Sequence, residues 1–463
     1  MGAVVGRELR TSVLVQKQID QLVGEVEKLS ARIEGIRSPD GSEVESYKAA
    51  LEKLGKSRGR PLHYPYLGSG IGRGPYVELE DGSVKLDLIN GIGVHLFGHS
   101  HPRVLRATVR GALSDITNQG NLQPNTEYAQ LANKIVELAG KNTRLRHTWI
   151  TTCGSRANEK ALKICRQKLT PARKVLAFEK AFAGRTTMMA QITDNPGFKE
   201  GLPDYHEVLR LPFFDKADPV RSTERTLAKM KEHISNNKGE ICSFMFEIVQ
   251  GEGGFRIGTR EFFLPLLELA KENKIPCWAD EIQTFTRTGE LFAFETLGIS
   301  SYIDVCTIAK VLQSAAVIYT EELNPKPGLI AGTFSGSSAA LSAGFEILEM
   351  ITTGGYLGAA GKVETLHKKV VGMLNGLSEG SCKGHIEDAG GLGLMIAFTP
   401  FRGDKDKVTK LLSVMFKNGI VAFSAGRDPY RVRFLVPLVL TDADIEVARQ
   451  ILEKSIFEVV QGA

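Results

Sequence analysis

The apolar and polar positions near the N-terminus follow a helical period. Between residues 13 and 36, apolar side chains recur three or four positions apart among Lys, Glu and Gln, which is typical of an amphipathic helix. The Pro-Asp-Gly sequence at 39–41 breaks this pattern, and Ser42 with Glu45 then resembles a capping box that opens a second helix. A segment of about 50 residues forms only a marginal hydrophobic core by itself. We therefore expect residues 1–60 to be a helical extension, packed on the main body or on a partner subunit.

A different period follows. Residues 76–80 and 83–88 alternate apolar and polar around an Asp-Gly pair, which predicts a β-hairpin. The glycine-rich segment 67–75 before it lacks the GxGxxG pattern and precedes no clear helix. We interpret that segment as a flexible connection and not as a nucleotide site.

The middle of the chain alternates short apolar runs with longer helical patterns. Continuous apolar runs at 241–246, 275–279 and 302–308 are typical of strands buried on both faces, and they predict a mostly parallel sheet covered by helices. A long helix after residue 339 leads into an α/β tail with expected strands at 392–398 and 431–440. The expected domains are a segment at 61–101 with the hairpin as part of a small domain, a large domain at 102–338 and a smaller C-terminal domain at 339–463.

Composition narrows the class of protein. The chain has 42% hydrophobic and 24% charged residues, which is ordinary for a globular protein. The net charge of +5 is spread thinly, so nucleic-acid binding gains little support. Membrane insertion and secretion are not expected, because no membrane-length apolar stretch and no signal core are present. The six cysteines form no CxxC pair, so we expect reduced thiols, a cytoplasmic location and no metal.

Two charged residues stand directly after buried runs. Lys310 follows the run at 302–308, and Asp280 follows the run at 275–279. Taken alone, a snorkelling lysine and a helix-capping aspartate are the better interpretations. Together they lie at the carboxyl ends of strands in one sheet, where α/β proteins bind ligands. Pyridoxal phosphate (PLP) needs a lysine for a Schiff base and an aspartate against its pyridine nitrogen.

A third element suits the phosphate of that cofactor. Residues 149–163 predict a strand, a Gly-Ser turn at Gly154 and Ser155, and then a helix. Free backbone N–H groups at a helix start bind anions, and the hydroxyl of Ser155 adds a donor. An ordinary strand-to-helix turn has the same pattern, so this motif is weak when taken alone.

The order of these motifs resembles the class III, or ω-amino, family of PLP-dependent aminotransferases, over about residues 75–445. The aspartate motif Ala-Asp-Glu-Ile-Gln-Thr at 279–284 precedes the lysine by 30 residues (310 − 280). Further similar stretches lie at 90–94, 98–102, 182–186, 247–254, 287–289 and 332–334. The resemblance implies an α/β protein of PLP-dependent transferase fold type I, whose large domain holds a mostly parallel sheet of seven strands.

The resemblance also implies roles for the cofactor-binding residues. Gly154 and Ser155 would hold the phosphate, and Phe182 would stack on the pyridine ring. Gln283 would donate to the phenolic oxygen of the cofactor. Thr333 would reach the phosphate of the partner subunit, so that a homodimer shares its active sites. Taken alone, Phe182 is better interpreted as a core residue.

Further residues would bind the substrates. Arg185 and Arg433 would bind carboxylates, for which a guanidinium fork is well shaped. Glu252 would pair with Arg433 when no second carboxylate is bound. Without the resemblance, both arginines would be interpreted as surface ion-pair partners.

The implied activity is a transamination in two half-reactions. Lys310 would hold PLP, be displaced by the donor amine and then move a proton as general base and acid. The expected donors are ω-amines or diamino acids such as lysine, ornithine or acetylornithine, and the acceptor is an oxo acid such as 2-oxoglutarate. An aminomutase similar to glutamate-1-semialdehyde aminomutase, or an inactive binding or scaffold protein of this fold, are the alternatives.

The chain also departs from the family pattern. These departures are Cys153 for Ser, Arg156 for Glu, Ala183 for His or Trp, and altered residues at 311–316 and 335–338. They shape the cofactor rim and the substrate channel, so the family does not fix the substrate.

Overall fold

The computed structural model describes residues 4–115, 117, 118, 120 and 122–462. The chain packs into two compact units, one formed by residues 1–106 and 364–463 and the other by residues 107–363. The second unit thus continues beyond the expected boundary at residue 338. Within the described ranges, every helix is too short or too polar to cross a membrane.

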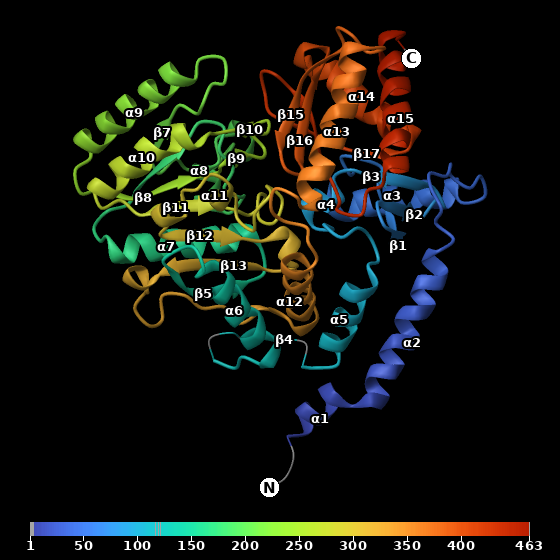
Figure 1. Cartoon of the computed structure of the whole chain (residues 1–463), viewed down its shortest axis with the longest axis horizontal. Coiled ribbons are helices and arrows are strands. Elements are labelled where there is room, and N and C mark those ends of the chain that lie inside the picture. The colour runs from blue at the N-terminus through green and yellow to red at the C-terminus, as the bar shows by residue number, and fades with distance from the viewer. Residues whose placement is uncertain (1–3, 116, 119, 121, 463) are drawn as a thin grey trace. The chain divides into compact units, whose positions relative to one another are not determined.

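A seven-stranded sheet forms the centre of the second unit (Figure 1). Six of its strands run in the same direction, and β13 runs antiparallel to its two neighbours, β5 and β12. The mostly parallel sheet is therefore confirmed. The spatial order is β5 (Leu145–Thr151), β13 (Ala315–Thr320), β12 (Val305–Ile308), β11 (Cys277–Asp280), β8 (Ile241–Phe246), β6 (Lys174–Phe178) and β7 (Val208–Leu211).

Helices cover this sheet. Helix α7 packs against β5, β8, β12 and β13, and α12 packs against α6. The helices of the unit are α6 (Thr126–Ala139), α7 (Gly154–Lys168), α8 (Thr187–Ile192), α9 (Pro219–Asn236), α10 (Arg260–Glu272), α11 (Ala293–Thr296) and α12 (Ser338–Thr353). Short elements complete it: β4 (Thr117–Asn118) with β14 (Gly336–Ser337), β9 (Val249–Gln250) with β10 (Arg256–Ile257), and the 3₁₀ turns η1 (Pro196–Phe198), η2 (Ser300–Tyr302), η3 (Lys310–Leu312) and η4 (Glu321–Leu323).

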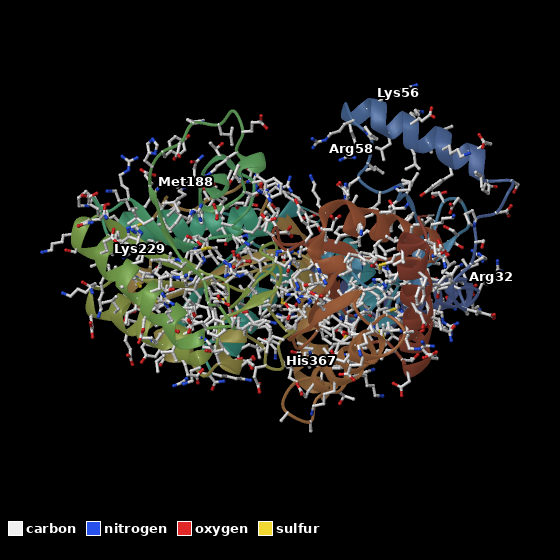
Figure 2. The ribbon with its side chains drawn as sticks, turned by 90° about the horizontal axis from the view of Figure 1, so that it is seen from above. Arg32, Lys56, Arg58, Met188, Lys229 and His367 are labelled. Atoms are coloured by element: carbon white, nitrogen blue, oxygen red, sulfur yellow. The ribbon has the colours of Figure 1, made fainter. Side chains whose placement is uncertain are left out.

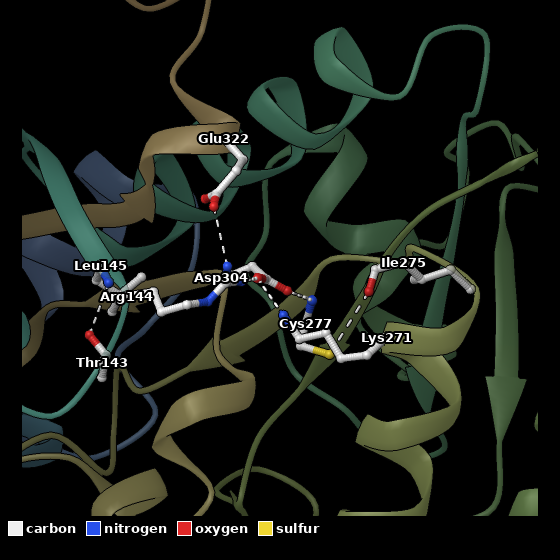
Figure 3. Close-up of polar contacts among 8 residues, drawn as sticks. All are labelled: Thr143, Arg144, Leu145, Lys271, Ile275, Cys277, Asp304 and Glu322. Carbon is white, nitrogen blue, oxygen red and sulfur yellow. Dashed lines mark hydrogen bonds and ion pairs between the residues drawn. The ribbon is translucent and has the colours of Figure 1, made fainter.

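The amino-terminal edge of the sheet is held by a buried carboxylate, Asp304, directly before β12 (Figure 3). Its Oδ1 accepts hydrogen bonds from Arg144 Nη2 and Lys271 Nζ, each over 2.6 Å. Its Oδ2 accepts a hydrogen bond from the backbone N–H of Cys277 over 2.9 Å. One carboxylate thus joins two cations to the starts of two central strands.

Two four-stranded sheets and several helices build the first unit. One sheet has the order β1 (Gly68–Arg73), β2 (Tyr76–Leu79), β3 (Val84–Asp87) and β17 (Ile420–Val421). The other has the order β15 (Ile386–Leu392), β16 (Met395–Pro400), β19 (Arg431–Leu435) and β18 (Phe423–Ala425). The remaining elements are α1 (Val5–Thr11), α2 (Val13–Ser30), α3 (Val44–Arg58), α4 (Asn90–Gly93), α14 (Lys405–Asn418), α15 (Asp442–Val460) and η5 (Phe401–Gly403), with α5 (Pro102–Ala112) and α13 (Lys362–Glu379) at the boundaries between the units.

The predicted hairpin is confirmed by the antiparallel pairing of β2 and β3. The prediction for the glycine-rich segment is wrong, because it contains a strand, β1, that pairs with β2. A Cβ atom at Gly72 would overlap His99 and the carbonyl of Tyr76. Gly72 therefore permits close packing of this strand, and the segment is not a flexible connection.

The N-terminal extension differs from its prediction in two details. Helix α2 ends at Ser30, and Arg37 instead forms a β-bridge with Val84. The expected capping box is wrong, because the hydroxyl of Ser42 donates to Asp40 over 2.7 Å and α3 begins one residue after Glu43. The last turn of α3 carries Lys56 and Arg58 (Figure 2), which suits the negative end of a helix dipole.

Candidate active site

The carboxyl-terminal edge of the seven-stranded sheet gathers most of the predicted site. Strands β8, β11 and β12 are parallel neighbours, so the residues at or just after their carboxyl ends, Glu247, Asp280 and Lys310, lie at one edge. Strand β5 also runs in this direction, because both it and β12 are antiparallel to β13. The turn at Gly154 therefore lies at the same edge.

Asp280, the last residue of β11, is a buried carboxylate held by two donors. Its Oδ1 accepts from the backbone N–H of Ile282 over 2.9 Å, and its Oδ2 accepts from Asn158 Nδ2 over 2.8 Å. Burial raises the pKa of Asp280 to about 6, although these hydrogen bonds and the charge of Lys310 favour its ionised form. The carboxylate is therefore largely ionised near pH 7 and available to a cationic partner.

Asn158 is a site residue that the sequence analysis missed. It is fully buried on α7, one turn after the turn at Gly154 and Ser155, and its Nδ2 also donates to the carbonyl of Ala183 over 2.8 Å. An asparagine on the apolar face of a helix, next to Ala157 and Ala161, was the signal for its role, because a buried amide needs partners.

Lys310 has a strained backbone. It is the first residue of η3 and has a φ of +53°, a conformation that residues other than glycine rarely adopt. Such strain persists where the surroundings fix it, and it is common at active sites. The lysine stands within electrostatic reach of Asp280, whose pKa its charge lowers.

Glu247 is a second residue with a role that the sequence analysis missed. Its Oε1 accepts from the backbone N–H of Phe182 over 2.9 Å, and its Oε2 accepts from the backbone N–H of Gly251 over 3.2 Å. Burial, together with the charge of Asp280, raises the pKa of Glu247 to about 8. Glu247 is thus mostly protonated at neutral pH, and it joins the loops that follow β6 and β8.

The turn at Gly154 and Ser155 forms a cradle. A Cβ atom at Gly154 would stand 2.7 Å from Ile282 Cδ1, and one at Gly184 would overlap Ser155 Oγ. The N-cap residue, Cys153, supplies no side-chain acceptor to the first turn of α7. The backbone N–H groups of that turn have no partner within the helix, so they suit an anion.

Gln283 follows Ile282, the residue that packs against Gly154, and its amide packs closely against Gly251. Its side chain is buried, and its Oε1 accepts no hydrogen bond from any residue in the described parts of the chain. A Cβ atom at Gly251 would overlap the Gln283 amide. The fully buried Arg287 donates to the backbone carbonyl of Gln283 over 3.2 Å, so it fixes the backbone of this loop.

The loop after β6 carries Phe182 and Arg185. Phe182 is half-buried and Arg185 is exposed. The Oγ1 atom of Thr193 accepts from the backbone N–H groups of Ala183 over 2.9 Å and Gly184 over 3.2 Å. These contacts fix the loop between the two residues.

Thr333 lies exposed at the end of a loop that α7 holds. Lys160 Nζ donates to the carbonyl of Ala331 over 3.1 Å, and Lys163 Nζ donates to that of Leu329 over 2.6 Å. The helix that begins with the phosphate cradle thereby also fixes the segment that presents Thr333.

The remaining two predicted residues belong to different units. Glu252 is half-buried in the loop after β9 in the second unit. Arg433 is buried in the middle of β19 in the first unit, opposite Phe423 and Ala397. Their pairing stays a prediction.

These residues fit PLP. The cofactor has a phosphate, a pyridine nitrogen and a phenolic oxygen. The glycine cradle with Ser155 suits the phosphate, buried Asp280 suits the nitrogen, and Gln283 places a buried polar amide at the same edge for a polar ring substituent. A sheet with these groups at its carboxyl-terminal edge defines a fold type I PLP enzyme.

Comparison with known proteins identifies the family. The model of the family "Aminotransferase class-III" matches residues 66–456, and the chain belongs to this family of PLP-dependent aminotransferases. It is 31% identical over 395 residues to the acetylornithine aminotransferase of Bacillus cereus, covering 83% of this chain and 93% of that protein.

Solved structures agree with this fold. Lysine aminotransferase from M. tuberculosis matches with a TM-score of 0.79 at 20% identity, over 88% of this chain and 99% of that one. Ornithine aminotransferase from Toxoplasma gondii matches with a TM-score of 0.77 at 22% identity, over 91% of this chain and 99% of that one.

Proposed function

We propose that this aminotransferase moves an amino group from an ω-amine or diamino acid, of the lysine, ornithine or acetylornithine type, to an oxo acid such as 2-oxoglutarate. The observation that carries the proposal is the placement of Lys310 within electrostatic reach of the buried, hydrogen-bonded Asp280. The name of the Bacillus cereus relative supports a donor of this type.

The cofactor, when bound, supplies an electron sink that stabilises negative charge on the substrate carbon. Lys310 supplies the amine that attaches the cofactor and, once displaced by the donor, moves a proton as general base and acid. Asp280 holds a proton on the ring nitrogen through its carboxylate. Asn158 orients that carboxylate by its 2.8 Å hydrogen bond.

The other residues bind and orient. Gly154 and Ser155 hold the phosphate, Phe182 stacks on the ring, and Gln283 donates to the phenolic oxygen. Thr333 reaches the phosphate of the partner subunit of a homodimer, which its exposed position supports. The active sites are then shared between subunits.

In this proposal, two arginines bind the carboxylates of the substrates. Arg185 binds one carboxylate, and Arg433 binds the second carboxylate of a dicarboxylate. Glu252 pairs with Arg433 when the bound substrate carries an ω-amine instead. We also place the enzyme in the cytoplasm, which its six free cysteines, five of them buried, support.

A donor screen tests the proposal. Lysine, ornithine, acetylornithine and 4-aminobutyrate are each incubated with the holoenzyme and 2-oxoglutarate, and glutamate formation is measured. We expect one or more donors to yield glutamate and to change the visible absorbance of the cofactor, which 2-oxoglutarate then restores. An enzyme that reacts with amines but is not restored by any oxo acid would favour an aminomutase.

Substitutions test the proposed role of Lys310. Lys310→Ala is expected to lose the visible absorbance and at least a thousandfold in rate, because both attachment and proton transfer fail. The matched control is Lys231→Ala on the exposed face of α9, which should retain both. Colourless wild-type protein that binds no PLP would contradict the proposal and favour a scaffold.

A further inference from the structure

The guanidinium of Arg185 stacks on the aromatic ring of Phe198, a residue that has no role in the proposed function. Its Cζ lies 3.7 Å from the centroid of the Phe198 ring. The same ring meets Phe182 edge to face, with centroids 6.3 Å apart and ring planes at 84°. One half-buried phenylalanine therefore touches both the arginine proposed for substrate and the aromatic residue proposed for the cofactor.

The local chain fixes Phe198 in this place. The backbone N–H of Asp194 donates to the carbonyl of Ala181 over 2.8 Å, and its carboxylate accepts from the backbone N–H of Lys180 over 2.7 Å. Asn195 then caps η1, and its side chain accepts from the backbone N–H of Gly197 over 3.1 Å. The turn that ends with Phe198 is thus built on the loop that carries Phe182.

Stacking and carboxylate binding use different parts of a guanidinium. The ring covers one face of the planar group, while the N–H donors project from its edge, where a carboxylate binds in a fork. Arg185 is exposed, and a free arginine side chain loses much rotamer entropy when it binds. A ring that already holds the guanidinium reduces that loss.

We propose that Phe198 is a positioning residue for the substrate carboxylate: it holds Arg185 with its donor edge open to a carboxylate beside Phe182. The inference rests on the proposed function of Arg185 and deepens it. Cation–π contacts at exposed sites correspond to about two- to fivefold in a binding constant, and partly desolvated ones to tenfold or more. Loss of the ring should therefore weaken carboxylate binding about three- to tenfold.

Glutarate, a dicarboxylate without an amine or oxo group, tests this without turnover. Its binding to the PLP-loaded enzyme is measured by calorimetry for wild type, Phe198→Leu, Phe198→Met and Phe198→Tyr. We expect the leucine and methionine variants to bind glutarate about three- to tenfold more weakly and the tyrosine variant to bind like wild type. Phe457→Leu, at an exposed phenylalanine of α15, is the matched control and should bind like wild type.

A double-mutant cycle shows whether Phe198 acts through Arg185. Arg185→Gln should weaken glutarate binding, and Phe198→Leu should add nothing in that background. Steady-state kinetics should give a larger increase in the KM for 2-oxoglutarate than decrease in kcat. An equal loss from Phe198→Leu with or without Arg185, or unchanged binding in Phe198→Leu and Phe198→Met, would overturn the proposal.

The proposed function and the role of the Arg185–Phe198 pair can be tested separately. Absence of transamination with every donor would overturn the proposed function, while glutarate binding would still report on the pair. Unchanged glutarate binding in Arg185→Gln, in an enzyme that does transaminate, would overturn only the role of the pair. Thermal unfolding of each variant identifies any that has lost its fold, and Phe198→Met then replaces Phe198→Leu.

Discussion

The side-chain amide of Asn158 donates to the carboxylate of Asp280 over 2.8 Å, and the same nitrogen donates to the carbonyl of Ala183 over 2.8 Å. One buried asparagine therefore joins α7, the end of β11 and the loop that carries Phe182. Its position couples the helix proposed to bind the phosphate to the carboxylate proposed for the ring nitrogen.

Removal of this amide should shift the titration of Asp280. Asn158→Ala deletes a hydrogen bond that stabilises the ionised carboxylate, so the pKa of Asp280 should rise above its value of about 6. A hydrogen bond to a charged group corresponds to about one pKa unit or more. PLP binding to the apoenzyme, followed by absorbance, should then fail at a higher pH than in wild type. Asn236→Ala, at an exposed site on α9, should leave the midpoint unchanged, and an equal midpoint in Asn158→Ala would contradict the assignment.

Glu247 should make the apoenzyme less stable as the pH rises. Its pKa is about 8 in the folded chain, against 4.5 for an unperturbed glutamate, so the folded state holds a proton that the unfolded state has lost. The stability is therefore full below about pH 4.5 and falls as the pH rises through 8.

Glu247→Gln cannot lose a proton at this position. Between pH 5 and 8, denaturant unfolding of apo Glu247→Gln should lose about 3–4 kcal/mol less stability than wild type. Glu272→Gln, at an exposed residue of α10, should keep the wild-type slope. Parallel slopes in wild type and Glu247→Gln would show that Glu247 does not titrate in this range.

Gly184→Ala should weaken cofactor binding. Gly184 has a φ of +129°, and a Cβ atom there would overlap Ser155 Oγ. The serine would have to leave the phosphate cradle, and we expect the Kd for PLP to rise about tenfold. Fluorescence titration of the apoenzyme with PLP measures this change. Gly201→Ala is a matched control, since Gly201 also has a positive φ, of +76°, but has no atom within 4 Å of the added methyl group. Similar Kd values in the two variants would contradict the role of Gly184.

The strand ends of the site were predictable from the sequence. Lys310 and Asp280 follow continuous apolar runs, and parallel strands bring their carboxyl ends to one edge. Polar residues that directly follow such runs therefore lie at the same edge of the sheet, whatever path the loops take. The resemblance added roles for Phe182 and Gln283, which an apolar pattern cannot give.

The contacts between loops were not predictable. Between Arg185 and Phe198 lie α8 and a turn whose path depends on Asp194 and Asn195, and no periodic pattern shows where the two side chains meet. Strand β1 was not predicted for a similar reason. Glycine has no side chain, so a glycine-rich strand lacks the alternation of apolar and polar residues by which a strand is recognised. The capping box predicted at Ser42 is absent because the carboxylate of Asp40 accepts the hydrogen bond from the Ser42 hydroxyl.

Asp304 should contribute to stability without affecting the cofactor. Its carboxylate accepts from Arg144, Lys271 and the backbone of Cys277 (Figure 3). Asp304→Asn keeps an acceptor for the backbone but removes the charge that both cations share, so that Arg144 keeps only its exposed partner Glu322. Breaking a buried pair costs about 3–5 kcal/mol. The side chains of Arg144 and Lys271 are 48% and 31% exposed and can turn to water, so a loss of about 2 kcal/mol is expected. Denaturant unfolding of the apoenzyme measures it.

The Kd for PLP should stay at the wild-type value, because Asp304 lies at the edge of the sheet opposite Asp280. Glu322→Gln removes only the exposed partner of Arg144, 3.2 Å away, and should cost less than about 0.5 kcal/mol. Equal losses in the two variants would show that the buried carboxylate is no more important than the surface pair.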